Sequence, residues 1–354
     1  MSIIIDSNIK KASTLPSSYY TDEDKFRENR EIFRKSWHFA GHINQLEGYS
    51  SIPLDHMEGL VGEPMIMTDE EEIRCISNVC THRGMLVCRE KSTKKTLQCP
   101  YHGRTFGIDG SFKAMPEFEG VEGFPSPEDD LFHFPTKIWK GLVFAGVEPS
   151  GLNSSLDELQ KRLGWIPIES FQYDHSRERS YEIRANWALY VDNYLEGFHI
   201  PFVHQDLNSV LDYENYRTET FPRGVLQIGI ASDGEQSFHL PKESPDYGLR
   251  VAAYYYWIFP GLMLNFYPWG LSVNVVVPLS VDRTRIIYQG FVGDNSFLGK
   301  GAGGDLDKVE SEDQEIVEAT HRGVSSKRYD RGRYSPTKET GVHHFHRILT
   351  DHTS

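Results

Sequence analysis

Two short segments of the sequence each combine one cysteine and one histidine with a glycine. The first reads CTHRG and contains Cys80 and His82, and the second reads CPYHG and contains Cys99 and His102. Zinc fingers usually take two cysteines from one segment and two histidines from another, whereas here each segment brings one of each. A Rieske centre needs two thiolates on one iron and two imidazoles on the other. The four residues therefore predict a Rieske [2Fe-2S] cluster, with a zinc knuckle as the alternative.

The other two of the four cysteines show no such pattern. Cys75 lies in a strand-like run, and Cys88 lies between the two Cys/His segments. Isolated cysteines often behave as small buried apolar residues, and four cysteines in a chain of this length do not make a disulfide framework. We expect Cys75 and Cys88 to be buried without a chemical role.

A second group of polar residues lies in a mostly apolar segment with helical periodicity. Asp192, Glu196 and His199 follow the spacing i, i+4, i+7, which predicts that they share one helical face. Pro201 disfavours helix at the residue before it, so we expect the chain to bend there and to bring His204 back toward His199. Two histidines at such a bend can share one metal ion, although a single histidine on an apolar face is more often a core residue.

The third ligand should be a carboxylate if the metal is non-haem iron(II), because oxygenases of this kind use two histidines and one carboxylate. Asp313 is the candidate, since it falls on the apolar stripe of a C-terminal helical pattern; the stripe consists of Val309, Ile316, Val317 and Thr320. A buried carboxylate needs a partner, which a metal would supply. A salt bridge or a role in the first helical turn is the alternative. The neighbouring acids are expected to form a solvated face: Glu310, Glu312 and Glu315.

The elements that must position these residues differ between the two halves of the chain. Helical periodicity predicts a helix over residues 22–37, and short runs of β-forming residues then predict a small all-β domain up to about residue 149. A Ser/Asn-rich stretch at 149–155 is a candidate boundary. The expected strands of this domain cover residues 38–43, 65–67, 73–78 and 138–147.

The second half is expected to combine helices with an antiparallel meander, which makes the chain an α+β protein. Helical patterns cover residues 156–163, 187–198 and 305–323, and a glycine-rich hinge at 299–304 precedes the last of them. Strand patterns cover residues 179–185, 225–230, 250–259, 262–267, 271–277 and 284–291.

Composition and charge exclude several other classes of protein. The 354 residues are 38% hydrophobic and 25% charged, as in globular proteins. The net charge of −14 repels a phosphate backbone, so we expect no nucleic-acid partner. The sequence has no run of about 18 apolar residues, and the apolar run near its N-terminus is too short for a signal sequence. We therefore expect a cytoplasmic protein without a membrane anchor.

Together the motifs resemble those of the Rieske non-haem iron oxygenases, specifically their α subunits, over about residues 20–350. The resemblance rests on CTHR, on CPYHG and on DNYLEGFH followed by a second histidine within 192–204. A looser likeness to the choline monooxygenase group, with its betaine and carnitine relatives, rests on four further runs: SED (311–313), HRG (321–323), GRY (332–334) and HHFH (343–346).

The resemblance implies two iron centres in this chain. It assigns the cluster to Cys80, His82, Cys99 and His102, and a mononuclear iron to His199, His204 and Asp313. Glu196 matches the acid that bridges the iron ligand to a cluster histidine of a neighbouring subunit, here His102, which implies a homotrimer. Electrons would come from NAD(P)H through a separate reductase or ferredoxin, and O2 would react at the iron with a small-molecule substrate.

The resemblance also implies the domain limits. Residues 1–36 would form a helical segment that packs on the catalytic domain, residues 37–150 an all-β Rieske domain, and residues 151–354 the catalytic domain. The last would be a helix-grip (START/SRPBCC-like) antiparallel sheet domain that holds the mononuclear iron.

Two aromatic runs, 254–257 and 266–269, fall in the strand-rich region expected around the iron. Aromatic faces attract quaternary ammonium groups, so the runs predict either a cage for such a substrate or ordinary sheet packing; Asn265 is a candidate polar group of the same pocket.

The predicted function is hydroxylation, with N-demethylation at an N-methyl group, of a small substrate such as choline or a betaine. Ring dihydroxylation or O-demethylation of an aromatic acid, and a pure Rieske electron carrier, are the alternatives. The terminal histidines are expected to be surface or subunit-contact groups: His343, His344, His346 and His352.

Overall fold

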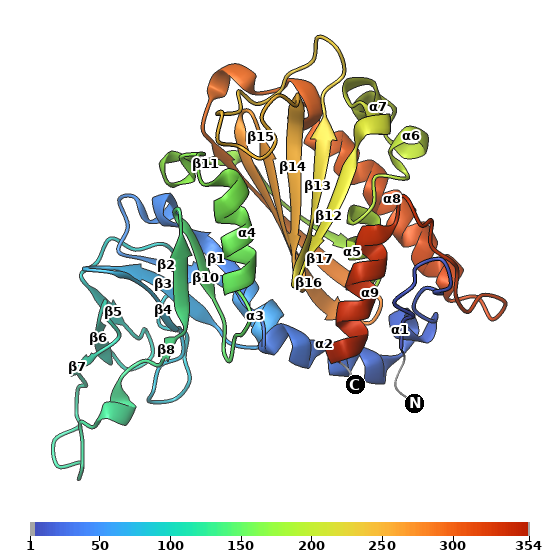
Figure 1. Ribbon diagram of the computed structural model, residues 1–354. Coiled ribbons are helices and arrows are strands. Elements are labelled where there is room, and N and C mark those ends of the chain that lie inside the picture. Colours follow the sequence, from blue (N-terminus) through green and yellow to red (C-terminus); the bar gives the residue numbers. More distant parts are fainter. Residues whose placement is uncertain (1–3, 353–354) are drawn as a thin grey trace. The chain divides into compact units, whose positions relative to one another are not determined.

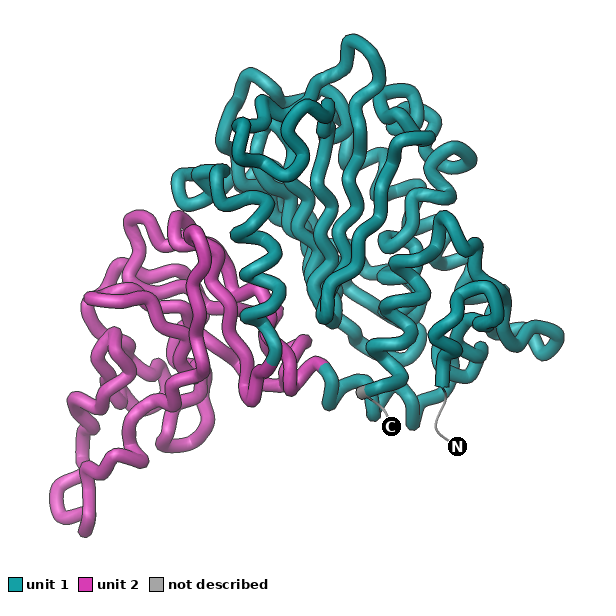
Figure 2. Tube along the Cα trace, viewed as in Figure 1, with its two compact units in different colours: residues 1–32, 151–354 teal, residues 33–150 magenta. Residues whose placement is uncertain are grey.

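Figure 2 shows the two compact units of the chain in a computed structural model, which describes residues 4–352. One unit is residues 33–150. The other joins the N-terminal residues up to Ile32 with the residues from Gly151 onward. The first helices therefore fold with the C-terminal half of the sequence. Along the chain, the smaller unit is inserted between the two segments of the larger unit.

The smaller unit contains three antiparallel sheets, as its short β-forming runs predict. Their strand orders are β1-β10-β9, β2-β3-β4-β8 and β5-β6-β7. The elements are β1 (His38–His42), β2 (Ser51–Leu54), α3 (Asp55–Val61), β3 (Met65–Asp69), β4 (Ile73–Ser77), β5 (Thr96–Gln98), β6 (Thr105–Gly107), β7 (Phe112–Ala114), β8 (His133–Phe134), β9 (Thr136–Trp139) and β10 (Leu142–Ala145). Cys75 and Cys88 are buried, as expected.

The strand predicted over residues 138–147 is in fact a hairpin. Trp139 at the end of β9 pairs with Leu142 at the start of β10. Between them Lys140 and Gly141 have φ of 45° and 85°, a left-handed pair that closes a two-residue turn. The sequence pattern misses the turn because lysine rarely adopts this conformation.

A seven-stranded antiparallel sheet is the centre of the larger unit (Figure 1). Its order is β11-β17-β16-β15-β14-β13-β12, so β12 to β17 form the predicted meander and β11 pairs with β17 at the far edge. The strands are β11 (Gln172–Ile183), β12 (Arg217–Phe221), β13 (Gly224–Ile230), β14 (Val251–Ile258), β15 (Leu262–Tyr267), β16 (Gly270–Ser280) and β17 (Arg283–Val292). The sequence patterns predict all of these except β12, whose residues are mostly exposed or half-buried.

Helices of this unit pack on the sheet and on one another. They are α1 (Ser18–Thr21), α2 (Glu23–Arg34), α4 (Asn153–Leu163), α5 (Trp187–Tyr194), α6 (Ile200–Val203), α7 (Gln205–Val210), α8 (Leu306–Val324) and α9 (Thr340–His352). α8 packs against α5, and α9 packs against β12 and β13. Side chains cap the two helices that flank the predicted metal site: Asn186 accepts from the Ala188 N–H, and Asp305 accepts from the Lys308 N–H.

The helix predicted over residues 187–198 ends four residues early. α5 gives way to a turn in which Gly197 lies against Tyr216: a Cβ on this glycine would come within 2.8 Å of the tyrosine ring. The chain becomes helical again in α6, whose first turn accommodates Pro201. The predicted break in the helix at Ile200 is therefore wrong, because α6 begins there. The helical path is interrupted before it, between α5 and α6, and again at His204, which separates α6 from α7. Glu196 also lies beyond the end of α5, so it does not continue a helical face.

The terminal histidines are more buried than expected. His346 is 1% exposed and His343 is 7% exposed, both within α9, and His344 is half-buried. The predicted surface role is therefore wrong for His343 and His346. The side chain of His352 lies outside the described residues.

His346 belongs to a buried hydrogen-bond network that joins α1, α5 and α9. Its Nε2 lies 2.7 Å from Asp192 Oδ1, and its Nδ1 lies 2.6 Å from Tyr334 Oη. Tyr20 Oη donates to Asp192 Oδ2 at 2.8 Å. Asp192 is thus held by this network and is not among the residues that converge on the predicted metal site.

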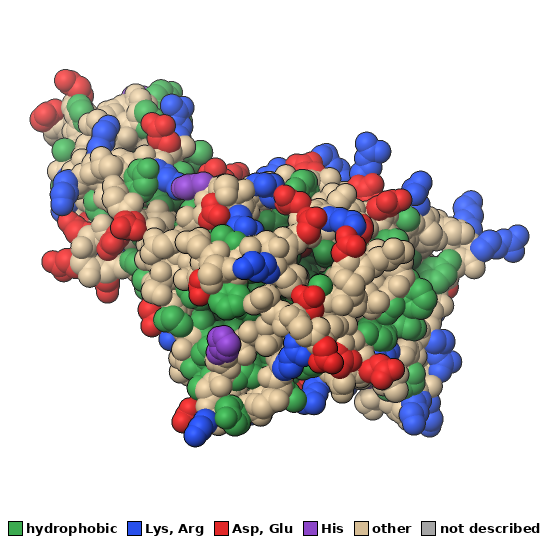
Figure 3. Space-filling view, turned by 90° about the horizontal axis from the view of Figure 1, so that it is seen from above, with side chains coloured by type: hydrophobic (Ala, Val, Ile, Leu, Met, Phe, Trp, Pro, Cys, Tyr) green, Lys and Arg blue, Asp and Glu red, His purple; other side chains and the backbone are tan. Residues whose placement is uncertain are grey.

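Charged side chains of both signs are intermixed on the face of the molecule seen in Figure 3. Acidic residues outnumber basic ones in the sequence, 51 to 37. Within residues 4–352, no helix combines the length and the apolar character needed to cross a lipid bilayer.

Candidate metal centres and catalytic cavity

The two Cys/His segments form loops of one design in the smaller unit. In each loop the cysteine N–H donates to the carbonyl oxygen five residues further on. The glycine four residues after each cysteine, Gly84 or Gly103, donates its N–H to the carbonyl oxygen of Cys80 or Cys99. These glycines have φ of 72° and 75°, which glycine adopts at little cost. The shared Cys-x-x-x-Gly spacing therefore builds two matching loops.

The loops bury the sulfur atoms and leave the imidazoles nearer to solvent. Cys80 and Cys99 are each 2% exposed, and neither forms a disulfide. Burial raises the pKa of the Cys80 thiol. The rings of His82 and His102 lie edge to face with centroids 4.8 Å apart, and His102 is exposed. Two buried thiols with two adjacent imidazoles are the donor set that a Rieske [2Fe-2S] cluster requires, so these residues fit the cluster.

The three predicted iron ligands converge in the larger unit. His199 and His204 flank α6, and Asp313 lies in the middle of α8. Their ligand atoms all lie within 4.8 Å of one another. The two Nε2 atoms are 3.2 Å apart, and Asp313 Oδ1 lies 3.0 Å from His204 Nε2 and 3.6 Å from His199 Nε2. Two donors that bind one metal at right angles, at about 2.1 Å each, are about 3.0 Å apart, so these spacings suit one face of an octahedral site.

A carboxylate lies on the other ring nitrogen of each histidine. Glu196 Oε1 lies 2.8 Å from His199 Nδ1, and Glu312 Oε2 lies 2.7 Å from His204 Nδ1. Such partners fix the ring proton on Nδ1 and turn the Nε2 lone pair toward the metal position. Two lone pairs then face the Asp313 carboxylate, an arrangement that repels unless a cation lies among the three acceptors. The residues therefore fit a bound iron ion.

The surroundings of these ligands favour positive charge at the same point. Burial lowers the pKa of His204, but the hydrogen bonds and charges of Asp313 and Glu312 outweigh burial and raise that pKa above its ordinary value. Asn193 Nδ2 donates to Asp313 Oδ1 at 2.6 Å, which holds the carboxylate toward the histidines. These carboxylates stabilise a positive charge at this point, whether a proton or a metal ion carries it.

A cavity of about 80 Å³ opens beside the three ligands, between α8 and the sheet. Four tyrosines line it: Tyr194, Tyr216, Tyr255 and Tyr267. Strand alternation decides which aromatic residues reach the cavity, because Tyr255 lines it while its neighbours Tyr254 and Tyr256 pack elsewhere in the core. Burial raises the pKa of all four lining tyrosines, so they are neutral phenols near pH 7.

Amide side chains hold one of these tyrosines in place. Tyr194 Oη donates to Asn265 Oδ1 at 2.7 Å, and Asn265 Nδ2 donates to Asn274 Oδ1 at 3.2 Å. Asn265, the polar candidate of the second aromatic run, thus lines the cavity.

Glu310 is a further acidic residue of this cavity. Tyr190 Oη donates to its Oε2 at 3.0 Å, Tyr288 Oη donates to the same oxygen, and Asn274 Nδ2 donates to Oε1 at 3.3 Å. Burial raises the pKa of Glu310 to about 7, and the nearby Asp313 carboxylate contributes to the rise.

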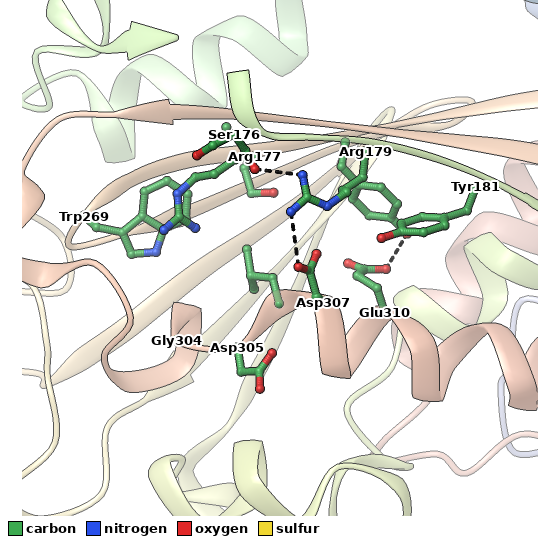
Figure 4. A pocket seen from close by; sticks show the side chains of 13 residues that line it. Ser176, Arg177, Arg179, Tyr181, Trp269, Gly304, Asp305, Asp307 and Glu310 are labelled. Carbon is green, nitrogen blue, oxygen red and sulfur yellow. Dashed lines mark hydrogen bonds and ion pairs between the residues drawn. The ribbon is translucent and has the colours of Figure 1, made fainter. Parts of the chain in front are cut away.

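A second cavity, of about 260 Å³, shares Glu310 with the first (Figure 4). Figure 4 shows Arg177 and Arg179 of β11 reaching into it across from the start of α8, where Asp307 lies opposite Arg179. Glu310 therefore stands where the two cavities meet.

The predicted solvated face of α8 is wrong for two of its three acids. Glu310 faces the cavity and Glu312 contacts His204, whereas Glu315 is exposed, as predicted. Glu310 lies three residues before Asp313, a spacing that places both on one helical face, so the sequence did carry a signal for it. The role of Glu312 depends on where α6 brings His204, which helical spacing alone does not give.

Comparison with known proteins identifies the family of this chain. A family model described as the ring hydroxylating alpha subunit (catalytic domain) matches residues 170–354, and one described as the Rieske [2Fe-2S] domain matches residues 36–125. The chloroplastic choline monooxygenase of Arabidopsis thaliana is 29% identical, over 96% of this chain and 83% of that protein. The carnitine monooxygenase oxygenase subunit of Escherichia coli K12 is 27% identical, over 97% of this chain and 94% of the relative.

Solved structures share the fold. The quaternary ammonium Rieske monooxygenase CntA in complex with L-carnitine superposes with a TM-score of 0.78 at 23% identity, over 98% of this chain and 97% of the other. Naphthalene 1,2-dioxygenase from Rhodococcus sp. superposes with a TM-score of 0.74 at 18% identity, over 96% and 93% of the two chains.

The chain belongs to the ring hydroxylating α subunits and carries their Rieske domain. It is an oxidoreductase, the terminal oxygenase component of a system in which a separate reductase supplies the electrons. Its cofactors are a Rieske [2Fe-2S] cluster and a mononuclear iron. The predicted family is confirmed. The zinc-knuckle alternative is set aside because the Rieske model matches residues 36–125, and the electron carrier alone is set aside because the catalytic-domain model matches residues 170–354.

Proposed function

We propose that this chain oxidises a small quaternary ammonium compound at an iron held by His199, His204 and Asp313. The observation that carries the proposal is the tyrosine-lined cavity beside these residues. Aromatic faces attract trimethylammonium groups without offering them a hydrogen bond. The choline and carnitine monooxygenases, which are similar over nearly the whole chain, support the same substrate class.

The aromatic walls of the cavity are fixed before a substrate arrives. The Tyr267 ring stacks on Trp269 with centroids 5.5 Å apart, and Tyr255 meets Tyr267 edge to face at 5.9 Å. Tyr194 is held through its hydroxyl group by Asn265. Preorganised rings bind a cation without the entropy cost of ordering them.

The residues around the proposed ligands have separate tasks in the reaction. The iron, when bound, supplies the activation of O2 on which hydroxylation in this family depends. Glu196 and Glu312 keep protons on the Nδ1 atoms of His199 and His204, so each Nε2 is free to bind the metal. The tyrosines stay protonated, hold the substrate beside the ligands and exclude water from the reacting C–H bond.

We also propose that Glu196 carries electrons between subunits of a homotrimer. In this arrangement its carboxylate would link His199 of one copy to His102 of the next, and Cys80, His82, Cys99 and His102 would hold the cluster. Glu196 already contacts His199 Nδ1 at 2.8 Å, and a groove of about 260 Å³ opens beside both residues. In the smaller unit His102 is exposed next to Tyr101, which is 56% exposed. The exposed imidazole of one copy and the open groove of the next support docking of two copies.

A single-turnover reaction tests the proposed activity without the cognate reductase. Iron-loaded, chemically reduced protein is exposed to O2 with choline, glycine betaine, L-carnitine or an aromatic acid, and the products are identified by mass spectrometry. We expect an oxidised or demethylated ammonium product. Conversion of the aromatic acid alone would refute the ammonium substrate and favour the ring-hydroxylating or O-demethylating alternative.

Mixed trimers test the path of the electrons. Asp313→Ala and His102→Ala chains, each expected to be inactive alone, are coexpressed with different tags and isolated together. Recovered turnover in the mixed species would show that electrons cross between copies, whereas persistent inactivity would contradict the trimer proposal. Glu196→Gln should keep the cluster spectrum and lose at least roughly tenfold in turnover, about 1.4 kcal/mol in barrier.

A further inference from the structure

Glu310 is a carboxylate of the catalytic cavity that the proposed chemistry has not used. It neither belongs to the three converging ligands nor touches the ring nitrogens behind them. Two phenols and one amide donate to it, so the carboxylate is held in place, and the residue lines the cavity. A carboxylate fixed in a cleft beside a metal site is a candidate for recognition of substrate.

No lysine or arginine forms an ion pair with Glu310 within residues 4–352, although two arginines reach the adjoining cavity (Figure 4). Arg179 pairs with Asp307 at 3.5 Å and also donates to backbone carbonyl oxygens of its own strand. The Arg177 guanidinium lies over the Trp269 ring at 5.2 Å, with its Nε 3.3 Å from Asp174 Oδ2. Both arginines are thus engaged elsewhere, and the Glu310 carboxylate, which is ionised above its pKa of about 7, pairs with no cationic side chain of the described residues.

The position of Glu310 suits a ligand that also reaches the metal site. It lies one helical turn before Asp313 on the same face of α8, and residues at this spacing are about 5–6 Å apart at Cβ. Both side chains line the cavity with the four tyrosines. A small cation between them would contact aromatic faces on its sides and a carboxylate at one end.

We propose that Glu310 is the counter-ion that selects a cationic substrate over a neutral one of the same shape. The inference rests on the proposed function, because it assumes an ammonium compound in the tyrosine-lined cavity. Glu196 and Glu312 are each paired with one of the proposed iron-binding imidazoles, so their charge is directed to the metal site. Glu310 lines the cavity without pairing with an imidazole, and its carboxylate can therefore attract an ammonium group. The tyrosines then supply fit and cation–π attraction, and Glu310 supplies the charge discrimination.

Binding of a charged ligand and of its neutral isostere tests this assignment. Choline and 3,3-dimethylbutan-1-ol have the same shape, and only choline carries the charge. Their dissociation constants are measured by isothermal titration calorimetry at about pH 8, where Glu310 with its pKa of about 7 is ionised. The samples are resting, cluster-containing, iron-loaded full-length protein of the wild type, Glu310→Gln and Glu315→Gln. Glu310→Gln keeps the size of the side chain, and Glu315 is an exposed acid of the same helix that controls for the change in net charge. Both substitutions keep the size of the side chain, and the cluster absorbance of each variant is compared with that of the wild type to check that the protein is folded.

We expect Glu310→Gln to weaken choline binding at least roughly tenfold and to leave the neutral isostere within about twofold of the wild type. Glu315→Gln should change neither constant. Equal loss for both ligands would mean that Glu310 shapes the cavity rather than recognises charge, and unchanged choline binding would also overturn the inference. Glycine betaine and L-carnitine are titrated into the wild type as further cations. If the wild type binds none of the three cations, the proposed function fails instead, so the two failures are distinct.

Discussion

Replacing Glu312 by alanine should weaken binding of the mononuclear iron about 10–100-fold. The carboxylate lies 2.7 Å from His204 Nδ1 and fixes both the orientation of the ring and the nitrogen that carries the proton. Loss of such a partner behind a metal-bound histidine typically costs this factor, which corresponds to about 1.4–2.8 kcal/mol. A hydrogen bond to a charged group has a similar worth, about 1.5–3 kcal/mol. Lys308, 4.0 Å from Glu312 and largely exposed, should add little.

The assay is a competition titration of the mononuclear site. Protein stripped of this iron under anaerobic conditions is titrated with iron(II) against a chelator of known affinity, while cluster absorbance shows that the smaller unit is intact. Glu315→Ala, which removes an exposed acid from the same helix, is the matched control and should bind iron as the wild type does. Equal affinity of Glu312→Ala and the wild type would refute the role of this contact. An equal loss in both variants would instead point to the net charge of α8.

Three other predictions follow from the same structure. Asp313→Ala should reduce the iron content from about three to about two per chain while the cluster spectrum is kept; a third iron retained in full would place the carboxylate ligand elsewhere. Cys75 is fully buried, which raises its thiol pKa to about 12, so mass spectrometry should find it unmodified after native treatment with iodoacetamide at pH 8 and modified after denaturation. His346→Ala should lower the free energy of unfolding by about 2–3 kcal/mol, because Asp192 and Tyr334 lose their buried partner; an unchanged denaturation midpoint would show that the network contributes nothing.

Six of the seven predicted ligands, all except Asp313, were accessible from the sequence because the spacings that bring them together are short. Cys80 and Cys99 each stand four residues before a glycine, and this short spacing alone builds the loops that hold them. His199 and His204 are five residues apart, so any tight bend between or before them brings the rings together. The helix break was predicted at Ile200, just before Pro201, and the structure places a break before α6, around Gly197, yet the two Nε2 atoms still meet at 3.2 Å. Because the two histidines are only five residues apart, the prediction that they meet does not depend on where the helix ends.

The contacts that the sequence did not predict join residues far apart in the chain. Glu312 reaches His204 over 108 positions, and His346 reaches Asp192 over 154. These pairings depend on how α8 and α9 pack, and periodicity within one helix does not contain that information. The same holds for the cavity, where alternation says that Tyr255 and Tyr256 face opposite ways but not which of the two faces α8.

Anomalous scattering at the iron edge, from crystals of the iron-loaded protein, tests the central claim most directly. The account predicts a pair of iron atoms between the Cys80 and Cys99 thiols and the His82 and His102 rings, and one separate iron bound by His199, His204 and Asp313. A single metal ion bound by all four residues of the two Cys/His loops, or a third iron outside the three converging ligands, would contradict it.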